Sequence, residues 1–539
     1  MRVNSAIRHR QKGATLLLLM LGLPIVFIPL VGLAIDGTRL YIVQAKLSAA
    51  VDGAALGAGR LLNTSANTSE IAGEFLNVNF PGGYWGTTDL TPTISYTNAL
   101  GTNTINVAAT VKAPLLFMRI FGQPTAIVAS SAVATRRNTR VELVLDHSGS
   151  MNCGGTCNAT MTSMLNGAKQ FTGMFTPGTD ELGLVAFSGS GIVAYPIYTQ
   201  PYDPSPLSAT QQGPDTSFAT SATAGPMFNQ INAMAAAGGT NSAEGLSLAY
   251  IELQKAHNRD AAGAGDNNLN SIVFFTDGIP TSLSVSPNNP SNNALLPYGV
   301  TGGHSPCTYN TNGGTTPDAA HTMAGWFTIF GASPPWNSLT VPAGLNLLRS
   351  KDTAHNSTWW VANGLADFGA TPNPSAAVSG CTEMGNGAGH FTPPVDLARI
   401  PSTDYWGNST NGSAYNLGAS YAGSCMVSYN PSQVNNPCHW GLAIWNAVDN
   451  VGSTIRNQSA LGSLPAPTGM LPITIFTIGY NGNATYPVDP VLLKRLANTQ
   501  DSTSYDPSQQ VGMYIQVGNA TNLGAAFAQV ASSLLRLAR

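Results

Sequence analysis

The chain has 539 residues, so it is too long for a single small disulfide-stapled fold. Charged residues make up only 9% of it, against roughly 25% in ordinary soluble domains, and the formal net charge is -3. The few lysines and arginines form no internal patch with aromatic residues between them. The composition therefore predicts no binding to nucleic acid.

A basic segment and an apolar run open the chain. Residues 1–12 contain arginines and a lysine, and residues 14–35 contain no charge. A helix that rises about 1.5 Å per residue would cross a bilayer core of about 30 Å over this run. We therefore expect a transmembrane helix at residues 13–35, with residues 1–12 in the cytoplasm. A cleaved secretory signal is the alternative, because small residues at 32–34 suit a peptidase, although such a signal has a shorter apolar core.

The cysteines follow this run and would lie in an oxidising compartment. Their even number of six favours disulfides. The spacing of Cys153 and Cys157 also suits a metal or a redox pair, but no second such pair accompanies them. Three pairings remain open for the other four, which are Cys307, Cys381, Cys425 and Cys438.

Residues 36–62 keep a helical pattern, with apolar residues three to four positions apart, and we expect them to form a stalk. Short β-type runs follow at residues 91–96, 104–111 and 127–134, with Pro, Asn and Gly between them. The sequence predicts a small β-rich module at residues 63–137.

The segment of residues 8–62 carries a family resemblance. It starts Arg-His-Arg-Gln-Lys-Gly-Ala, its apolar run ends Gly-Leu-Ala-Ile-Asp-Gly-Thr-Arg-Leu-Tyr, and it continues Lys-Leu-Ser-Ala-Ala-Val-Asp-Gly-Ala-Ala-Leu. It resembles the amino-terminal domain of TadG-like proteins of tight-adherence (Flp) pilus assembly. Pilins of related systems are cut after a glycine and carry Glu five residues later. Gly13 is present here, but Leu18 takes the place of the Glu, which favours a permanent anchor.

The resemblance implies a location and partners. It implies a single-pass protein of the bacterial inner (cytoplasmic) membrane, with its bulk periplasmic or extracellular. Pilus or envelope components are the implied partners.

Beyond residue 137, apolar runs alternate with amphipathic helical patterns. The apolar runs, which are typical of strands buried on both faces, are residues 141–145, 182–187, 272–275 and 473–478. The helical patterns are residues 161–175, 243–253, 444–455 and 523–537. This alternation predicts an α/β fold, a doubly wound parallel sheet with helices on both sides.

Polar residues gather where these strands end. The sequence Asp-His-Ser-Gly-Ser begins at Asp146, directly after the first strand, Thr240 precedes a helix, and Asp277 follows the strand at 271–276. Ligands of doubly wound sheets bind at the carboxyl ends of strands, where the strand order reverses. Each piece alone is often only a helix cap or a turn. Together they offer the hard oxygen ligands that Mg²⁺ prefers.

The pattern Asp-x-Ser-x-Ser, a loop Thr and a strand-end Asp resembles the metal-ion-dependent adhesion site (MIDAS) of von Willebrand factor A domains. The resemblance covers residues 138–280 and 438–539. It implies that both aspartates act mostly through water, so that a carboxylate of a partner protein completes the metal shell. The implied ligands of Mg²⁺, or of another divalent cation, are Asp146, Ser148, Ser150, Thr240 and Asp277.

Between the two parts of the A-type domain, residues 281–437 break the alternation. The stretch holds most of the tryptophans and three of the six cysteines, so we expect an ordered, disulfide-bearing insertion. No general base is evident at the metal site, and adjacent residues such as His147 and Ser148 point apart on a tight loop. The sequence therefore predicts no enzyme.

The expected function is metal-dependent protein binding by a membrane-anchored component of tight-adherence pilus assembly or surface adhesion. One alternative is a structural anchor that links envelope layers, with a metal that serves stability only. The other is a glycan-active enzyme whose cleft lies in the insertion and uses acids from the set Asp318, Asp367, Glu383, Asp396 and Asp404.

Overall fold

The computed structural model divides the chain into two compact units, Met1–Arg136 and Arg137–Arg539. The structure describes residues 7–60, 65–151, 158–189, 191–198, 205–236, 239–262, 266–285, 323–328, 345–350, 390–391, 400–412, 428–433, 437–482 and 487–537. Cys438 lies within these ranges and is disulfide-bonded. The other cysteines, 153, 157, 307, 381 and 425, lie outside them, so the pairing stays open.

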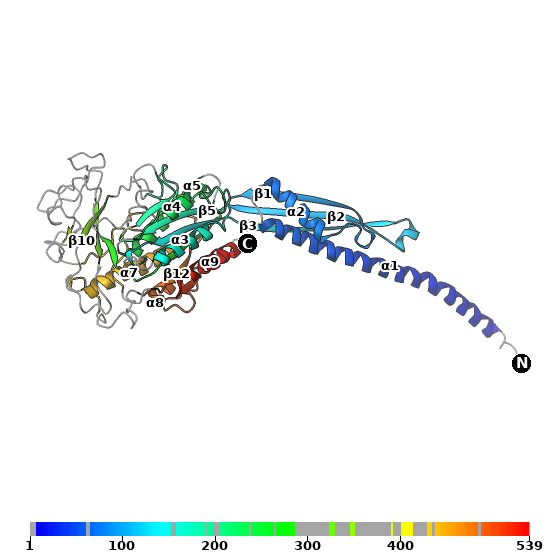
Figure 1. Ribbon diagram of the computed structural model, residues 1–539. Helices are drawn as coiled ribbons and strands as arrows, with labels where there is room; N and C mark the ends of the chain where they lie inside the picture. The colour runs from blue at the N-terminus through cyan, green and yellow to red at the C-terminus, as the bar shows by residue number, and fades with distance from the viewer. Residues whose placement is uncertain are drawn as a thin grey trace. The chain divides into compact units, whose positions relative to one another are not determined.

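One long helix, α1 (Ile7–Arg60), runs through the first unit and includes the predicted anchor and stalk (Figure 1). A second helix, α2 (Ser65–Asn79), packs against it. A sheet in the order β1-β2-β3 follows, with β1 (Thr88–Ala99), β2 (Thr102–Pro114) and β3 (Thr125–Arg137). The three predicted strands are confirmed, whereas α2 was not expected.

The second half of α1 belongs to the core of this unit. Val43, Leu47 and Val51 are at most 1% exposed, and they pack in one apolar cluster with Leu76 of α2 and Val107 of β2. Strand β2 alternates buried and accessible residues, as a strand does when one face covers a core. The stalk is therefore part of the β-rich module and not a free helix.

The first half of α1 has a different surface. Val26, Phe27, Ile28, Leu30, Val31 and Leu33 are between 51% and 61% exposed. Val26–Gly59 is the one helical stretch, among the residues whose side chains are described, that is long and apolar enough to cross a membrane. The exposed apolar side chains named above lie before Asp36, in the part that the sequence predicts as the anchor.

Asp36 joins α1 to the loop between β2 and β3. Its carboxylate is buried and accepts backbone N–H bonds from Leu116 (2.8 Å), Phe117 (3.0 Å) and Met118 (2.9 Å). These amides lead into a 3₁₀ turn, η2 (Met118–Phe121). Charge-assisted bonds to the free amides of a helical turn are strong, so Asp36 holds this loop on the helix.

Replacing Asp36 by Ala should release the loop. We expect the amides of residues 116–118 to exchange hydrogen at least about tenfold faster, because each loses its acceptor. Hydrogen exchange with mass spectrometry on the full chain in detergent measures this. Thr38→Val is the matched control, since the hydrogen bond of the Thr38 hydroxyl in the described part of the chain stays within α1, to the Ala34 carbonyl. Unchanged exchange in Asp36→Ala would show that the carboxylate does not hold the loop.

The second unit contains a six-stranded sheet in the order β13-β12-β7-β4-β5-β6. All neighbouring strands are parallel except the edge pair β5 and β6. The predicted α/β class is confirmed. The strands are β4 (Thr139–Asp146), β5 (Glu181–Phe187), β6 (Gly191–Tyr195), β7 (Leu269–Thr276), β12 (Thr474–Tyr480) and β13 (Tyr514–Val517).

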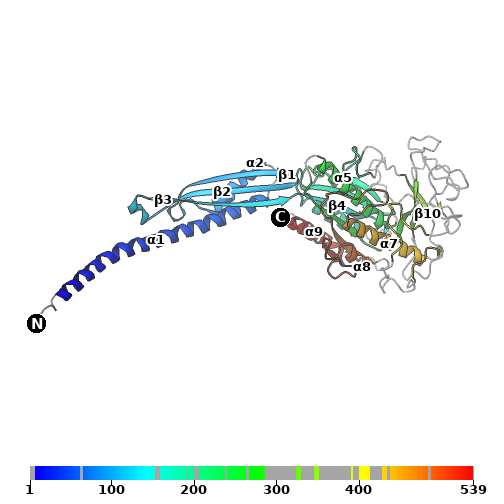
Figure 2. The same cartoon turned by 180° about the vertical axis from the view of Figure 1, so that it is seen from behind.

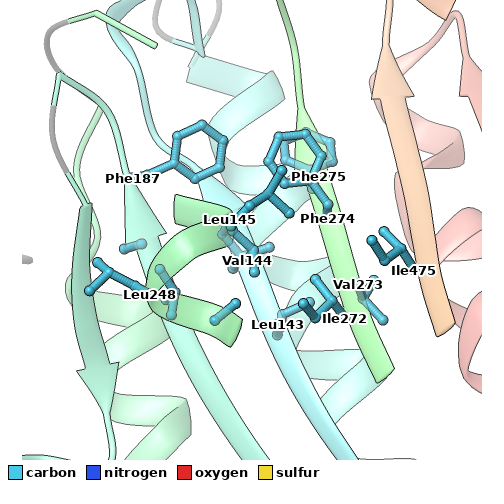
Figure 3. Packing of buried hydrophobic residues seen from close by; sticks show 14 of the residues in the cluster. Leu143, Val144, Leu145, Phe187, Leu248, Ile272, Val273, Phe274, Phe275 and Ile475 are labelled. Atoms are coloured by element: carbon cyan, nitrogen blue, oxygen red, sulfur yellow. The ribbon is translucent and has the colours of Figure 1, made fainter. Parts of the chain in front are cut away.

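Helices cover both faces of this sheet (Figures 1 and 2). The ring of Phe274 stacks on Phe187 at 5.3 Å, and Phe187 lies against Gly245 of α5. The next residue, Phe275, contacts Phe527 of α9 at 5.8 Å. Consecutive strand residues thus point to opposite faces of the sheet, and Figure 3 shows Phe187, Phe274 and Phe275 within one continuous apolar cluster. The helices are α3 (Asn158–Thr172), α4 (Pro226–Ala233), α5 (Ser242–Ala261), α7 (Pro437–Arg456), α8 (Pro490–Leu496) and α9 (Leu523–Leu537).

A second sheet lies in the predicted insertion. Its strands are antiparallel, in the order β11-β10-β9-β8. They are β8 (Ser282–Val285), β9 (Met323–Thr328), β10 (Leu345–Ser350) and β11 (His390–Phe391). Most of the insertion lies outside the described residues.

The amino-terminal end of the six-stranded sheet holds a buried ion cluster. Arg140 of β4 is fully buried and pairs with Glu181 (2.6 Å), Asp266 (2.7 Å) and Asp260. Arg259 adds a second positive charge beside Glu181 at 2.8 Å. This cluster joins the starts of β4 and β5 to the loop before β7, at the opposite end of the sheet from Asp146.

Glu142 lies two residues further along β4, where the positive charge of Lys255 offsets its own only in part. Its carboxylate is fully buried, and neither oxygen has a hydrogen-bond partner in the described part of the chain. A Cβ at Gly183 on the neighbouring strand would come within 2.2 Å of this carboxylate, so a larger residue there would displace the Glu142 side chain. Burial, and then the negative charge of Glu252, raise the pKa of Glu142 well above its ordinary value of 4.5.

Replacing Glu142 by Met should stabilise the protein. An acid whose pKa is raised by folding binds its proton more tightly in the folded state, so its contribution to stability falls as pH rises above 4.5. We expect Glu142→Met to gain about 1–3 kcal/mol at pH 8 and clearly less at pH 4. Urea unfolding at both pH values measures the difference. A variant less stable than the parent at pH 8 contradicts this account.

Candidate metal centre

The predicted site lies where the strand order of the sheet reverses. From β4 the chain continues to β5 on one side and later to β7 on the other. Asp146 is the last residue of β4, and Asp277 directly follows β7, its parallel neighbour. Such a switch point opens a crevice at the carboxyl ends of the two strands. The fold therefore brings both aspartates to the same edge.

Four of the five predicted residues form one hydrogen-bonded cluster. Asp146 Oδ1 accepts the backbone N–H of Ser148 at 2.8 Å. The hydroxyls of Ser148 and Ser150 lie 2.9 Å apart. Both donate to Asp277 Oδ1, Ser150 at 2.7 Å and Ser148 at 3.4 Å. A 3₁₀ turn, η3 (Gly149–Met151), follows Ser148 and brings the two hydroxyls to one side.

Thr240 is held next to this cluster by its backbone. Its N–H donates to the Thr281 hydroxyl at 3.0 Å, and its carbonyl accepts the N–H groups of Thr281 (2.9 Å) and Ser282 (3.1 Å). These partners follow Asp277 in the chain, so Thr240 lies beside the same loop. Among the hydrogen bonds of the described residues, none joins the Thr240 hydroxyl to the other four side chains.

Two supporting residues were not predicted from the sequence. The Thr276 hydroxyl donates to Asp146 Oδ2 at 2.6 Å and thereby fixes the carboxylate. Asn241 caps α5, because its side-chain oxygen accepts the N–H of Glu244, and its own N–H donates to the Ser188 carbonyl at 2.6 Å. The sequence Asn-Ser-Ala-Glu is a capping signal that could have identified Asn241. Nothing in the sequence singles out Thr276.

The two carboxylates are buried close together. Asp146 is 0% and Asp277 2% exposed. Burial raises the pKa of Asp146 to about 6. Burial and the charge of Asp146 raise the pKa of Asp277 well above its ordinary value. A bound cation would compensate these two charges.

The chemistry of the donors fits a hard cation. The cluster offers two carboxylates and neutral hydroxyls, and Mg²⁺ takes such oxygens together with water. No group of three or more His, Cys, Asp or Glu side chains in the described part of the chain could hold a metal. Zinc and copper, which favour nitrogen and sulfur ligands, suit these hydroxyls less well.

His147 has a structural role inside this loop. It is fully buried, and its Nδ1 donates to the Ala235 carbonyl at 2.6 Å. Burial lowers its pKa to about 4, so the ring is neutral at physiological pH. The Ser148 hydroxyl bonds to Ser150 and Asp277 instead, so these side chains form no Ser-His pair.

The glycan-cleft alternative involves one acid that the structure describes. Asp404 is only 5% exposed and accepts N–H bonds from Trp406 and Asn408, so its carboxylate caps a turn. The other four acids of that alternative, Asp318, Asp367, Glu383 and Asp396, lie outside the described residues.

A family comparison agrees with the amino-terminal resemblance. Residues 13–61 match the family model described as putative Flp pilus-assembly TadE/G-like. The amino-terminal segment is TadE/G-like. The resemblance expected for residues 8–62 is thus confirmed, and it relates the chain to Flp pilus assembly. No curated protein matches the chain.

Solved structures similar to the chain include von Willebrand factor A proteins. A von Willebrand factor type A protein from Catenulispora acidiphila is 11% identical, with a TM-score of 0.30, over 83% of this chain and 51% of that one. The vWF domain of the type V pili tip protein Mfa5 from Porphyromonas gingivalis is 16% identical, with a TM-score of 0.32, over 75% of this chain and 98% of that domain. The PilB minor pilin from Streptococcus sanguinis is 13% identical, with a TM-score of 0.32, over 84% of this chain and 79% of the pilin.

The alignment thus spans about half the length of the Catenulispora protein. At such TM-scores these likenesses carry no argument of their own. The arrangement of the second unit rests on its strand order and on the cluster at its switch point.

Proposed function

We propose that this protein is a membrane-anchored component of tight-adherence (Flp) pilus assembly or surface adhesion that binds a partner protein through Mg²⁺ or another divalent cation. The observation that carries the proposal is the cluster of Asp146, Ser148, Ser150 and Asp277 at the switch point of the sheet. The TadE/G-like match at residues 13–61 supports the pilus context.

The donor set favours adhesion over catalysis. Asp146, Ser148, Ser150, Thr240 and Asp277 would hold the cation, and only two of them carry negative charge. Such a shell leaves the cation electrophilic, so that a carboxylate from a pilus or envelope component would complete it. The neighbouring imidazole of His147 is buried and bonded to a backbone carbonyl, so it is not placed to act as a general base.

The exposed apolar half of α1 supports the anchor. Side chains such as Phe27 and Leu30 are more than half exposed, which is costly in water and favourable in lipid. With the basic residues before it, the helix would place its amino terminus in the cytoplasm of a bacterial cell. The metal centre would then lie on the periplasmic or extracellular side.

The proposal is tested by binding to isolated pili. The full-length protein in detergent is immobilised and offered pili sheared from cells that make Flp pili, with Mg²⁺, with EDTA, and with EDTA followed by excess Mg²⁺. We expect binding to fall at least about tenfold in EDTA and to return with Mg²⁺. Pili whose carboxylates have been converted to amides should not bind. Equal binding with and without EDTA contradicts the role of the metal.

A further inference from the structure

The loop between β2 and β3, residues 115–124, has an unusual surface. It follows β2 with the sequence Leu-Leu-Phe-Met-Arg-Ile-Phe, which contains a single charge, that of Arg119. Leu116 is 53%, Ile120 78% and Phe121 63% exposed. Neighbouring apolar side chains of this size rarely stay in water unless a surface covers them.

This loop lies on the apolar half of α1. A Cβ at Gly32 would come within 2.5 Å of the Phe117 ring, so the ring rests on the helix where only glycine leaves room. Gly32 is buried, while Val31 and Leu33 on either side of it are more than half exposed. One turn later, Asp36 binds the loop amides. Figures 1 and 2 both show this end of the sheet alongside α1.

The depth of the loop follows from these contacts. Asp36 is the first charged residue after the apolar run that we assign to the membrane, and Gly32 lies about 6 Å before it along the helix. The contact at Gly32 therefore lies inside the outer end of the proposed span. Amphipathic segments at an interface bury their apolar side chains about 5–10 Å deep, which matches this position.

A second element marks the headgroup level. Trp85 in the 3₁₀ turn η1 (Tyr84–Gly86) is 49% exposed, and the Arg39 guanidinium lies 5.7 Å from its ring centre. Arg39 also donates to the Trp85 carbonyl at 3.0 Å. An apolar groove of about 450 Å³ runs from Leu30 along α1 to Trp85. Tryptophan and arginine at this level are typical of the membrane–water boundary.

We propose that residues 115–124 form a second membrane contact, in which Leu116, Ile120 and Phe121 insert into the outer leaflet beside α1. The proposal rests on the membrane anchor of the proposed function. The occupant is a lipid bilayer, because the exposed side chains of the loop continue the exposed apolar surface of α1 at Gly32. Arg119 can extend its charge to the phosphates while its stem stays in the apolar layer. The loop and α1 would together fix the first unit at the membrane surface.

Photo-crosslinking tests the proposal on the full-length protein in vesicles of phosphatidylethanolamine and phosphatidylglycerol. The photoreactive amino acid p-benzoyl-phenylalanine replaces Ile120 or Phe121 in the loop. In the matched control, the same amino acid replaces Val133 of β3, which is 63% exposed. In the anchor probe, it replaces Phe27 of α1. We expect lipid adducts at positions 27, 120 and 121, and at least about tenfold less at 133.

The outcomes separate the two proposals. Lipid adducts at 27 with none at 120 and 121 overturn the loop contact and leave the anchor standing. No lipid adduct at 27 overturns the anchor. Protein adducts in place of lipid at 120 and 121 show that another protein covers the loop, which also overturns the membrane contact. The probes at 120 and 121 replace exposed side chains, so folding is retained, and the melting temperature of each variant checks this.

Discussion

Replacing Asp277 by Asn should abolish Mg²⁺ binding while the second unit stays folded. The Asn side-chain oxygen can still accept the hydrogen bond that Ser150 donates to Asp277 Oδ1 at 2.7 Å, but one of two buried negative charges is lost. Without the cation, the variant also avoids repulsion with Asp146. We expect the affinity for Mg²⁺ to fall at least about 100-fold, measured by titration calorimetry on the metal-free full-length protein.

Asp501→Asn is the matched control for this variant. It removes the same charge from a side chain that is 64% exposed and paired with Lys494 at 2.6 Å, so its Mg²⁺ affinity should equal that of the parent. Parental affinity in Asp277→Asn would rule out the proposed metal centre. If Asp277→Asn loses stability together with pilus binding, the metal serves stability only, as in a structural anchor.

Replacing Arg140 by Met should cost about 3–5 kcal/mol of the free energy of unfolding. Arg140 is fully buried among Glu181, Asp260 and Asp266, and its removal leaves these acids with the charge of Arg259 and the hydrogen bond that His257 donates to Asp266. Urea unfolding of the full-length protein in detergent measures the loss. Lys494→Met is the control, because the pair of Lys494 with Asp501 is partly exposed and should contribute less than about 1 kcal/mol.

The ion cluster also predicts a pH dependence. Burial alone would raise the pKa of Asp266. The hydrogen bond with His257 and the charge of Arg140 outweigh this effect and lower the pKa from 3.8 to about 2. A depressed pKa stabilises the folded state above the ordinary value, and this contribution is lost as pH falls through the folded value. The parent should lose stability from about pH 4 toward pH 2, and Arg140→Met should lose less. Equal slopes would contradict this account of Asp266.

The sequence predicted the central strands because both faces of them are buried, so they contain continuous apolar runs. The edge strands β6 and β13 escaped prediction for different reasons. Strand β6 is only five residues long and antiparallel, and it begins with Gly191, directly after the sequence Ser-Gly-Ser. Strand β13 has one buried residue, Val517, so its pattern is weak. Helix α2 was missed because Asn, Ser and Thr dilute its apolar side of Ile71, Phe75 and Leu76.

The candidate site was predictable because its residues follow strand ends, and parallel strands end at one edge of a sheet. Asp146 and Asp277 indeed follow neighbouring strands. The position of Thr240 could not be predicted, because it depends on hydrogen bonds to Thr281 and Ser282, about forty residues later and outside any regular repeat. The periodicity of apolar residues in a sequence indicates which faces are buried. Hydrogen bonds between two loops produce no such periodic pattern.

Helix α1 carries a mechanical consequence for the first unit. The same uninterrupted helix that presents exposed Phe27 and Leu30 also buries Leu47 and Val51 in the core of the module. No flexible linker separates these two halves, so the module cannot rotate freely relative to the first half of the helix. If the helix tilts in a bilayer, the sheet β1-β2-β3 would therefore tilt with it as one rigid body.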